Sequence, residues 1–469
     1  MFFQILSHAA LLVRSGNKTL LTDPWLFGSC YWRSWWNYPP VSRELVENLV
    51  PDAIYITHVH WDHFHGPSLR RFPKRTPILI PLERSTRISR DLKDMGFTNL
   101  VEIPHGKSLK LSTDFTITSY QFSPWGDSAL VIEAEGIAML NANDAKFMGS
   151  PLNQILNRHK GFDFAFRSHS SANDRICYYY TDKTEPKQEE PELYAQSFFK
   201  FMERVKPKYA VPFASNHCYL HKDVYHLNGI VETPIRVQNY VAAAGGFSHT
   251  ELKVMVSGDS WDSEKGFDIN SGTWFTNREK HIEAYLADNQ HKLEATYAQE
   301  NRARVHIGQL EGYFSHLFKI VPRALKRPFK HKPIILCAKY GDNADYFKID
   351  LYRGDVSQVT KEDLRSDSLV FETTALVIKK AMAFNMFSHV GISKRVIYRS
   401  RYEDAKYIEK FNALLAAYEY EVLPLDHLFS CRTLKVYLRR WREIVLYVQV
   451  AIGMLRGKSI HQLEAEQLA

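Results

Sequence analysis

Four side chains that commonly bind metals occur within six residues of one another. The run His58-Val59-His60-Trp61-Asp62-His63 follows residues 52–57 (DAIYIT), which we predict to be a short buried strand. His58 and His60 are two residues apart, so both point the same way in a chain that leaves a strand. Asp62 and His63 follow on a turn, where adjacent side chains diverge and can face two neighbouring ions. Imidazole and carboxylate ligands suit zinc, iron, nickel or copper, whereas the alternative is a surface loop that is merely rich in histidine.

The first 150 residues alternate short β runs with helical stretches. We expect strands at 9–14, 19–22, 52–57, 77–80, 115–120 and 129–134, and helices at 43–49, 67–71 and 85–95. This order of elements predicts a layered α/β domain with mixed sheets. Further strands at 209–213, 334–338 and 346–351, with helices at 191–205, 368–383 and 403–420, predict a smaller C-terminal α/β domain.

A chain of 469 residues is long enough for two or three domains. We expect residues 1–260 to form a metal-binding catalytic domain. Residues 261–332 read as a helical and basic connection, because 319–333 contain six Lys/Arg and three Pro. Residues 333–469 are expected to form a C-terminal α+β accessory domain.

Composition narrows the class of protein. The net charge of +8 is modest for this length and favours an anionic small-molecule substrate or a membrane surface over nucleic acid, which is not expected as a partner. Five scattered cysteines without a CxxC pair indicate a reducing compartment. The first sixteen residues lack the pattern of a signal peptide, and the apolar run 444–455 is shorter than the roughly 20 residues that cross a bilayer. We therefore expect a soluble, cytoplasmic protein without membrane contact.

The histidine-rich run resembles the metal-binding motif of the metallo-β-lactamase superfamily. The resemblance implies an αββα sandwich and two divalent metal ions, zinc or iron, bridged by a water or hydroxide. In the superfamily the first two histidines hold one metal, and the aspartate and last histidine help to hold the second. Asp144, after the expected strands 130–133 and 137–140, stands where the superfamily places its bridging carboxylate.

Two further positions follow from the same resemblance. A last histidine ligand is expected after strand 209–213; His221 is preferred, and His217 is the alternate. Many members also carry a histidine between the run and the bridging aspartate, but residues 117–129 (ITSYQFSPWGDSA) contain none. Gln121 and Asp127 are the nearest polar substitutes, and His105 comes earlier than that ligand usually does. The site is therefore expected to be one ligand short.

The N-terminal segment narrows the resemblance. Residues 7–9 (SHA) and 20–26 (LLTDPWL) look like the branch with ascorbate-6-phosphate lactonase and N-acylphosphatidylethanolamine phospholipase D. Residues 23–29 (DPWLFGS), 140–145 (LNANDA) and 256–259 (VSGD) are similar to the CMP-N-acetylneuraminate hydroxylases outside their iron–sulfur domain. Those hydroxylases carry a Rieske cluster held by two Cys and two His. Here the spacing Cys218-Tyr219-Leu220-His221 stands alone, so an external donor would have to supply electrons.

The resemblance also implies roles for individual residues. One ion would be held by His58, His60 and His221, and the other ion or the bridge by Asp62, His63 and Asp144, with Asp62 as the catalytic residue. Asp23 could accept a hydrogen bond from a ligand histidine and fix its tautomer, or simply cap a turn. His8 and His169 could line the substrate pocket, although a lone histidine is often just packed. The candidates for an aromatic substrate wall or a core role are Trp25, Tyr31, Trp35 and Trp36.

Three functions remain open at this point. The first is a hydrolase that uses a metal-bound hydroxide on a phosphoester, lactone or amide with anionic character. The second is a diiron monooxygenase that hydroxylates a nucleotide-sugar or amide substrate with an external reductase. The third is a non-catalytic protein that binds metal or a membrane through basic segments such as 435–442 (KVYLRRWR). We place hydrolysis first because it needs no additional partner.

Overall fold

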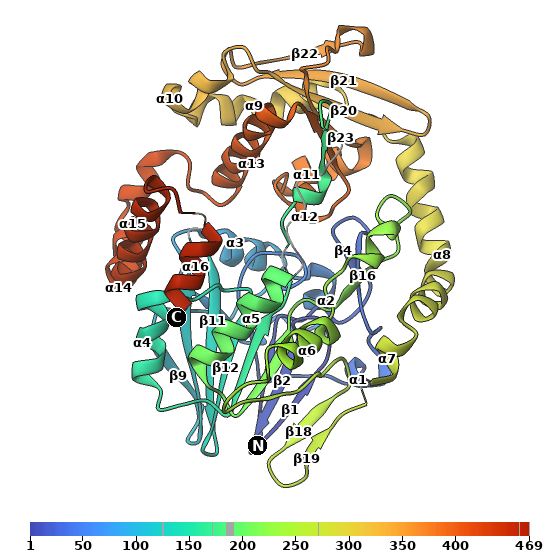
Figure 1. Cartoon of the computed structure of the whole chain (residues 1–469). Coiled ribbons are helices and arrows are strands. Elements are labelled where there is room, and N and C mark those ends of the chain that lie inside the picture. Colours follow the sequence, from blue (N-terminus) through green and yellow to red (C-terminus); the bar gives the residue numbers. More distant parts are fainter. Residues whose placement is uncertain (124–125, 171, 184–191, 271, 459, 469) are drawn as a thin grey trace.

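Two β-sheets face each other in the first part of the chain (Figure 1). The computed structural model describes residues 1–123, 126–170, 172–183, 192–270, 272–458 and 460–468. The first sheet has the strand order β19-β18-β1-β2-β3-β6-β7-β8. Its strands are β1 (Phe2–Ile5), β2 (Leu11–Ser15), β3 (Lys18–Thr22), β6 (Ala53–Tyr55), β7 (Ile78–Pro81), β8 (Leu100–Ile103), β18 (Ser260–Asp262) and β19 (Gly266–Asp268).

The second sheet has the order β17-β15-β13-β12-β11-β10-β9. Its strands are β9 (Lys107–Ser112), β10 (Phe115–Phe122), β11 (Asp127–Ala134), β12 (Ile137–Asn143), β13 (Phe164–Ser168), β15 (Tyr209–Phe213) and β17 (Glu251–Leu252). Alternate side chains of both sheets form the apolar layer between them, including Phe3, Tyr55, Leu130 and Phe164. The sandwich is therefore held by the period-2 pattern of its strands.

Helices cover both outer faces of the sandwich. Leu69 of α2 (Gly66–Arg70) and Leu92 of α3 (Arg87–Asp94) pack with Ile54 and Ile78 of the first sheet, beside α1 (Arg43–Val46). The second sheet is covered by α4 (Gly149–Arg158), α5 (Glu192–Val205) and α6 (Pro234–Ala243). This four-layer arrangement confirms the predicted αββα sandwich.

A third sheet lies above the sandwich (Figure 1). Its order is β14-β24-β23-β20-β21-β22, with bounds β14 (Tyr178–Tyr180), β20 (Ile334–Tyr340), β21 (Asn343–Asp350), β22 (Asp355–Val359), β23 (Leu369–Thr374) and β24 (Ile397–Ser400). Its core also contains side chains of α9 (Ile307–Ile320), α11 (Ala375–Phe384) and α13 (Ala405–Glu419). The predicted C-terminal α/β architecture is confirmed, but the expected helix 368–383 is wrong in its first half, because LVFETT forms the buried strand β23.

The predicted division of the chain differs from the observed connectivity at three places. β18 and β19 follow residue 260, yet they extend the first sheet beside β1. β14, from the middle of the chain, pairs with β24 of the third sheet. The last helices, α14 (Cys431–Arg439), α15 (Trp441–Leu455) and α16 (Ile460–Leu468), return to the sandwich and pack beside α4 and α5 (Figure 1). The two parts therefore interleave.

Shorter elements join these layers. The small sheet β16-β5-β4 consists of β4 (Ser29–Cys30), β5 (Trp35–Asn37) and β16 (His217–Tyr219). The connection between the sandwich and the third sheet contains α7 (Gly272–Thr276), α8 (Arg278–Arg302) and α10 (Arg323–Lys326), and α12 (His389–Ile392) precedes β24. None of the described helices combines the length and the apolar character that crossing a bilayer requires.

Candidate metal centre

Five loops bring the site together because they follow strands whose carboxyl ends share one edge of the sandwich. β3 and β6 run parallel in the first sheet, and β12, β13 and β15 run parallel in the second. Asp23 follows β3, the histidine-rich run follows β6, and Asp144 follows β12. His169 follows β13, and the loop after β15 leads to His217. Residues far apart in the sequence therefore meet at one end of the fold.

The first cluster of candidate ligands contains His58, His60 and Asp144. His58 Nε2 lies 2.8 Å from His60 Nδ1 and 3.9 Å from Asp144 Oδ2. One ligand atom from each of the three side chains lies within 4.8 Å of the others. A single cation could therefore contact all three.

The second cluster contains His8, Asp62 and His63. Asp62 Oδ2 lies 3.1 Å from His8 Nε2 and 3.5 Å from His63 Nε2. Asp144 Oδ2 is only 3.2 Å from His63 Nε2, so the carboxylate of Asp144 touches both clusters. A carboxylate in this position could contact cations in both clusters. The structure thus brings together five of the six predicted ligands and adds His8 to them.

Asp23 organises the loops from beneath. Its fully buried carboxylate accepts hydrogen bonds from the Thr57 backbone N–H (2.8 Å) and the Thr57 hydroxyl (2.7 Å). It also accepts from His63 Nδ1 and Asn143 Nδ2, each at 2.8 Å. A cation bound here would displace the proton from Nε2, and the hydrogen bond from Nδ1 to Asp23 would then leave the Nε2 lone pair of His63 directed towards Asp62 and Asp144. The contact with a candidate ligand histidine is the one that the sequence predicted for Asp23.

The donor set fits divalent cations. The Nε2 atoms of His8, His63 and His217 are buried, and none of them makes a hydrogen bond within the described part of the chain. Buried polar atoms without partners are costly in a folded protein. Cations bound between the nitrogens of His8 and His63 and the carboxylates of Asp62 and Asp144 would satisfy these two nitrogens.

The electrostatics of the clusters depends on their burial. Burial lowers the pKa of His58, and the neighbouring His63 and His60 lower it further, so His58 is held neutral as a metal ligand must be. Burial also opposes the charged form of His63, but Asp62 and Asp23 outweigh it and raise the pKa of His63 well above its usual value. His63 in turn depresses the pKa of Asp62, against the effect of burial. His63 also lowers the pKa of Asp144 against the effect of burial, so the carboxylates of Asp62 and Asp144 are both ionised.

His221 does not join these clusters. It lies with Asp223 and Glu300, at 3.5 Å from Asp223 Oδ2 through Nδ1 and 3.4 Å from Glu300 Oε2 through Nε2. Arg395 pairs with the same two carboxylates. The preference for His221 as a ligand beside His58 and His60 is corrected for a geometric reason: the extended chain of β16 carries it towards α8.

His217, the alternate, lies next to the clusters. Its ring stacks on Trp35 at a centroid distance of 3.9 Å and lies 5.9 Å from the ring of His8. Its Nδ1 contacts Ser215 O at 3.0 Å, which leaves Nε2 unpaired. His8 is anchored opposite, because its backbone N–H donates to Asn37 of β5. The small sheet that pairs β5 with β16 therefore places both histidines.

The other predicted residues divide between the site and the core. Neither ring nitrogen of His169 makes a hydrogen bond to a described residue, and burial, with the nearby His8, lowers its pKa to about 3. Asp127 is the polar residue near the missing ligand position: burial and the Asp144 charge raise its pKa to about 7. Gln121 instead donates to Ile103 O and Ser119, and His105 accepts from the Gln121 backbone.

The sequence did not indicate two side chains that lie beside the histidine-rich run 58–63, those of His389 and Tyr420. The ring of His389, from α12, lies 5.3 Å from that of His60, and Tyr420, just after α13, lies 6.5 Å from it. The sequence suggested Tyr31 as an aromatic wall or a core residue, yet its hydroxyl donates to Asp62 Oδ1 at 2.6 Å. No local sequence pattern indicates these contacts, because His389 and Tyr420 lie more than 300 residues after the histidine-rich run.

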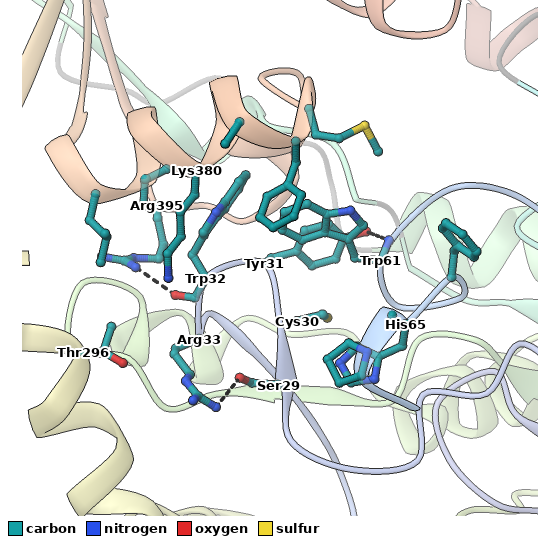
Figure 2. A pocket seen from close by; sticks show the side chains of 18 of the residues that line it. Ser29, Cys30, Tyr31, Trp32, Arg33, Trp61, His65, Thr296, Lys380 and Arg395 are labelled. Carbon is teal, nitrogen blue, oxygen red and sulfur yellow. Dashed lines mark hydrogen bonds between the residues drawn. The ribbon is translucent and has the colours of Figure 1, made fainter. Parts of the chain in front are cut away.

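A cavity of about 830 Å³ opens on the other side of Tyr31 and Trp61 (Figure 2). It lies between the α2–α3 side of the sandwich and helices α8 and α11. Tyr31 and Trp61 form part of its wall, as the sequence suggested for Tyr31. Trp25 and Trp36 are fully buried and belong to the core.

The comparisons with known proteins agree with this architecture. Residues 18–212 match the family model described as "Beta-lactamase superfamily domain". These residues form a beta-lactamase superfamily domain. The match confirms the resemblance predicted from the histidine-rich run. Candidate ligands His58, His60, Asp62, His63 and Asp144 all lie within the matched domain. His8, His217 and the strands of the third sheet other than β14 lie outside it.

Curated relatives match a shorter segment. The cytidine monophosphate-N-acetylneuraminic acid hydroxylase of Mus musculus is 32% identical over 147 residues, which cover 30% of this chain and 25% of that protein. The hydroxylase of Xenopus laevis is 31% identical over the same share of each chain. The protein of Homo sapiens, named as inactive, is 30% identical, with 30% and 29% covered. The match thus spans about a quarter of the length of these relatives.

Solved structures include distant neighbours. An isothiocyanate hydrolase from Delia radicum gut bacteria has a TM-score of 0.39 and 16% identity, covering 56% of this chain and 99% of that one. The Zn²⁺-bound PqqB from Methylobacterium extorquens has a TM-score of 0.36 and 12% identity, covering 56% and 100%.

Proposed function

We propose that this chain is a metal-dependent hydrolase that acts on an anionic substrate at the His/Asp centre. The observation that carries the proposal is the pair of ligand clusters joined by Asp144, with buried Nε2 atoms that lack hydrogen-bond partners. His58, His60 and Asp144 would hold one cation, and His8, Asp62 and His63 the other. Bound divalent cations would supply Lewis-acid activation of water and of the attacked oxygen.

The protein groups around the centre fit this chemistry. Tyr31 fixes the orientation of Asp62 through its hydrogen bond, and Asp23 fixes the ring of His63. Lys146 donates to Ser168 at 2.7 Å, and burial, together with nearby Arg167, lowers its pKa to about 8. A largely protonated lysine beside Asp144 can neutralise an anionic group of the substrate. Burial of the histidine rings excludes bulk water from the reacting groups.

A second candidate is hydroxylation by a diiron centre with an external electron donor. The observation that favours it is the match to the cytidine monophosphate-N-acetylneuraminic acid hydroxylases over 147 residues. Imidazole and carboxylate donors suit iron as well as zinc, so the donor set supports both candidates. The two differ in what they consume: hydrolysis needs only water, whereas hydroxylation needs oxygen and reducing equivalents.

The experiment combines metal analysis with two activity assays. Protein purified without chelator is analysed for zinc and iron, and hydrolysis of bis(4-nitrophenyl) phosphate is followed for wild type and for His58→Ala with His60→Ala. His316→Ala with His331→Ala is the matched control, because both lie outside the candidate centre. We expect metal and turnover in the wild type and the control only. Metal retained by the double site variant would overturn the ligand assignment, and reductant-dependent oxygen uptake without phosphodiester turnover would favour hydroxylation.

A further inference from the structure

The cavity beside the metal centre has an aromatic side. Tyr31 and Trp61 are stacked at 5.9 Å with an interplanar angle of 17°, and Trp32 meets Trp61 edge-on at 4.9 Å. Phe384, from α11, contacts Trp61 at 5.6 Å. The volume of the cavity, about 830 Å³, lies in the range of roughly 300–1,000 Å³ that is typical of small-molecule sites. A flat ring can therefore be accommodated against these walls.

The opposite side of the cavity is cationic. Lys380 and Arg395 approach from one side and Arg33 from the other (Figure 2). Arg395 is already paired with Asp223 and Glu300. Arg33 donates to Ser29 at 3.2 Å, but neither Arg33 nor Lys380 has a carboxylate partner within 4.0 Å among the described residues. Burial lowers the pKa of Lys380, and the charge of Arg33 adds to that effect.

A buried donor also lacks a partner in this cavity. Trp32 is 9% exposed and lines the wall, and its indole Nε1–H makes no hydrogen bond to any described residue. An acceptor atom on a bound molecule would satisfy it. Two unneutralised cations and a free donor around one space together favour an anion with further acceptor oxygens.

The cavity is linked directly to the metal centre. The Tyr31 hydroxyl, in the wall, donates to Asp62 and accepts from the Trp61 backbone N–H at 3.2 Å. Tyr31, Trp32 and Arg33 all have left-handed φ values of 50°, 56° and 66°. Such consecutive strained residues are rare and usually maintained for function. The turn therefore orients the ring of Tyr31, the indole N–H of Trp32 and the guanidinium of Arg33 towards the same cavity.

The geometry points to this cavity as the site that binds an aromatic, anionic part of the substrate, with Arg33 and Lys380 on the anion and Tyr31, Trp32 and Trp61 against the ring. This assignment rests on the proposed function, because it takes the bound molecule to be the substrate. The shared chemistry is an aromatic ring that bears a phosphate or carboxylate group.

The test measures binding directly in metal-free protein. Phenyl phosphate is titrated by calorimetry and by quenching of tryptophan fluorescence, with inorganic phosphate and phenol as separate arms. The site variant is Arg33→Ala with Lys380→Ala, and the matched control is Arg353→Ala with Lys361→Ala on the far edge of the third sheet. We expect phenyl phosphate to bind more tightly than either fragment, and at least tenfold more weakly to the site variant than to the control.

Three outcomes would overturn the assignment: no saturable binding at millimolar phenyl phosphate, equal binding by the site variant, or equal binding of phosphate alone. Because the binding assay contains no metal, its result is separate from the hydrolysis assay. If phenyl phosphate binding depends on Arg33 and Lys380, the assignment of the cavity as a binding site is supported. If the metal-loaded protein also hydrolyses no substrate, the proposed hydrolase function is wrong.

A second, independent observation concerns the surface of α14 and α15. Twelve of the 21 exposed large hydrophobic side chains in the described chain lie between Leu425 and Leu455. The most exposed are Leu455 (88%), Phe429 (79%), Leu438 (74%), Leu434 (54%), Val448 (54%) and Trp441 (53%). Exposed apolar side chains gathered on two neighbouring helices in this way mark an interaction site.

The two helices are firmly attached by their inner side. Leu446 is buried in the layer that covers the second sheet, and Arg440 pairs with Glu83 and Glu443. Glu443 is the only acidic residue of α14 and α15. Lys435, Arg439, Arg442 and Arg456 have no carboxylate within 4.0 Å among the described residues. The outer face is therefore apolar and surrounded by free positive charge.

We infer that the outer face of α14 and α15 docks on an anionic lipid bilayer surface. Apolar side chains would enter the interface while the lysine and arginine groups contact anionic headgroups. A second copy of this chain fits less well, since two faces with the same positive charge would repel each other. The sequence did not favour membrane contact, but its basic segment 435–442, which lies in these helices, kept that contact as an alternative.

The test is co-sedimentation with vesicles of phosphatidylcholine, with and without phosphatidylserine. We expect binding only to the anionic vesicles, with at least fivefold loss for Leu438→Glu with Leu455→Glu. The matched control is Val50→Glu with Ile230→Glu, which changes two exposed residues elsewhere. Binding that persists in the site variant, or absence of wild-type binding, would overturn the inference. A dimer that the same variant dissociates, without vesicle binding, would assign the face to self-association instead.

Discussion

Replacing Asp23 with asparagine tests how the second layer of residues controls the metal centre. Asp23 accepts four hydrogen bonds of 2.7–2.8 Å, two from Thr57 and one each from His63 and Asn143. An asparagine keeps one acceptor oxygen and directs an NH₂ group at the remaining donors. His63 can avoid the resulting clash only by moving its proton from Nδ1 to Nε2. Nε2 then loses the lone pair that a cation needs.

The size of the effect follows from these contacts. Loss of a carboxylate behind a metal-binding histidine typically weakens metal affinity by about 10–100-fold, or roughly 1.4–2.8 kcal/mol. The folded state also loses a buried charged partner of His63, which costs about 3–5 kcal/mol. We therefore expect Asp23→Asn to lower both metal affinity and stability.

The assay is competition between the protein and a chromophoric chelator for zinc, combined with urea unfolding of the metal-free protein. Asp259→Asn is the matched control, because Asp259 is buried and accepts from the backbone N–H groups of Val256 and Asn270, outside the clusters. The control should lose stability but keep its metal affinity. If Asp23→Asn binds zinc within twofold of the wild type, the argument from the His63 tautomer is wrong.

Three further predictions concern neighbouring groups. His217→Ala should lower the bound metal or its affinity at least tenfold, whereas His221→Ala should leave the metal content unchanged. Elemental analysis measures both variants. The reverse pattern would show that His221 is a ligand after all. Arg395→Ala should destabilise the fold by about 3–5 kcal/mol in urea unfolding, because it leaves Glu300 and Asp223 without their cation, and a cost below about 1 kcal/mol would contradict this. Burial, opposed by Arg440, raises the pKa of Glu83 from 4.5 to about 7. The folded protein then binds this proton more tightly than the unfolded chain, so stability is lost as the pH rises from about 4.5 to 7, by up to about 3 kcal/mol. Glu83→Gln should remove that slope between pH 5 and pH 8, and an unchanged slope would refute the assignment.

Much of the sandwich could be predicted because its signals are local. Residues 52–57 read as a buried strand and 19–22 as another, and the structure has β6 (Ala53–Tyr55) and β3 (Lys18–Thr22) at these places. The error at residues 368–383 has a physical cause. Leu369, Val370 and Phe371 form a continuous apolar run in a strand with neighbours on both sides, and such a run has no alternation to separate it from a helix.

The residues of the candidate site also divide into those that local sequence signals indicate and those that they do not. The run from His58 to His63 and the position of Asp144 could be predicted, because each directly follows a strand and the order matches a known motif. The choice between His217 and His221 could not, since both follow β15 within eight residues. What decides it is the pairing of β16 with β5, a contact between residues some 180 positions apart. That these residues hold metal stays a prediction until the metal is measured.

The third sheet contributes to the centre in a way that the sandwich alone cannot. His389 and Tyr420 approach the His60 ring, and Phe384 completes the wall of the cavity. Glu419 accepts from the backbone N–H of Ser388 and from Tyr313, so the segments that carry these groups are tied to one another. Exchange of this later part of the chain would therefore change access to the metals and the shape of the cavity without altering the ligands. Selectivity for substrates should therefore depend on residues after 375, such as Lys380 and Phe384, together with the wall formed by Tyr31, Trp32, Arg33 and Trp61. Metal binding should depend on residues before 220.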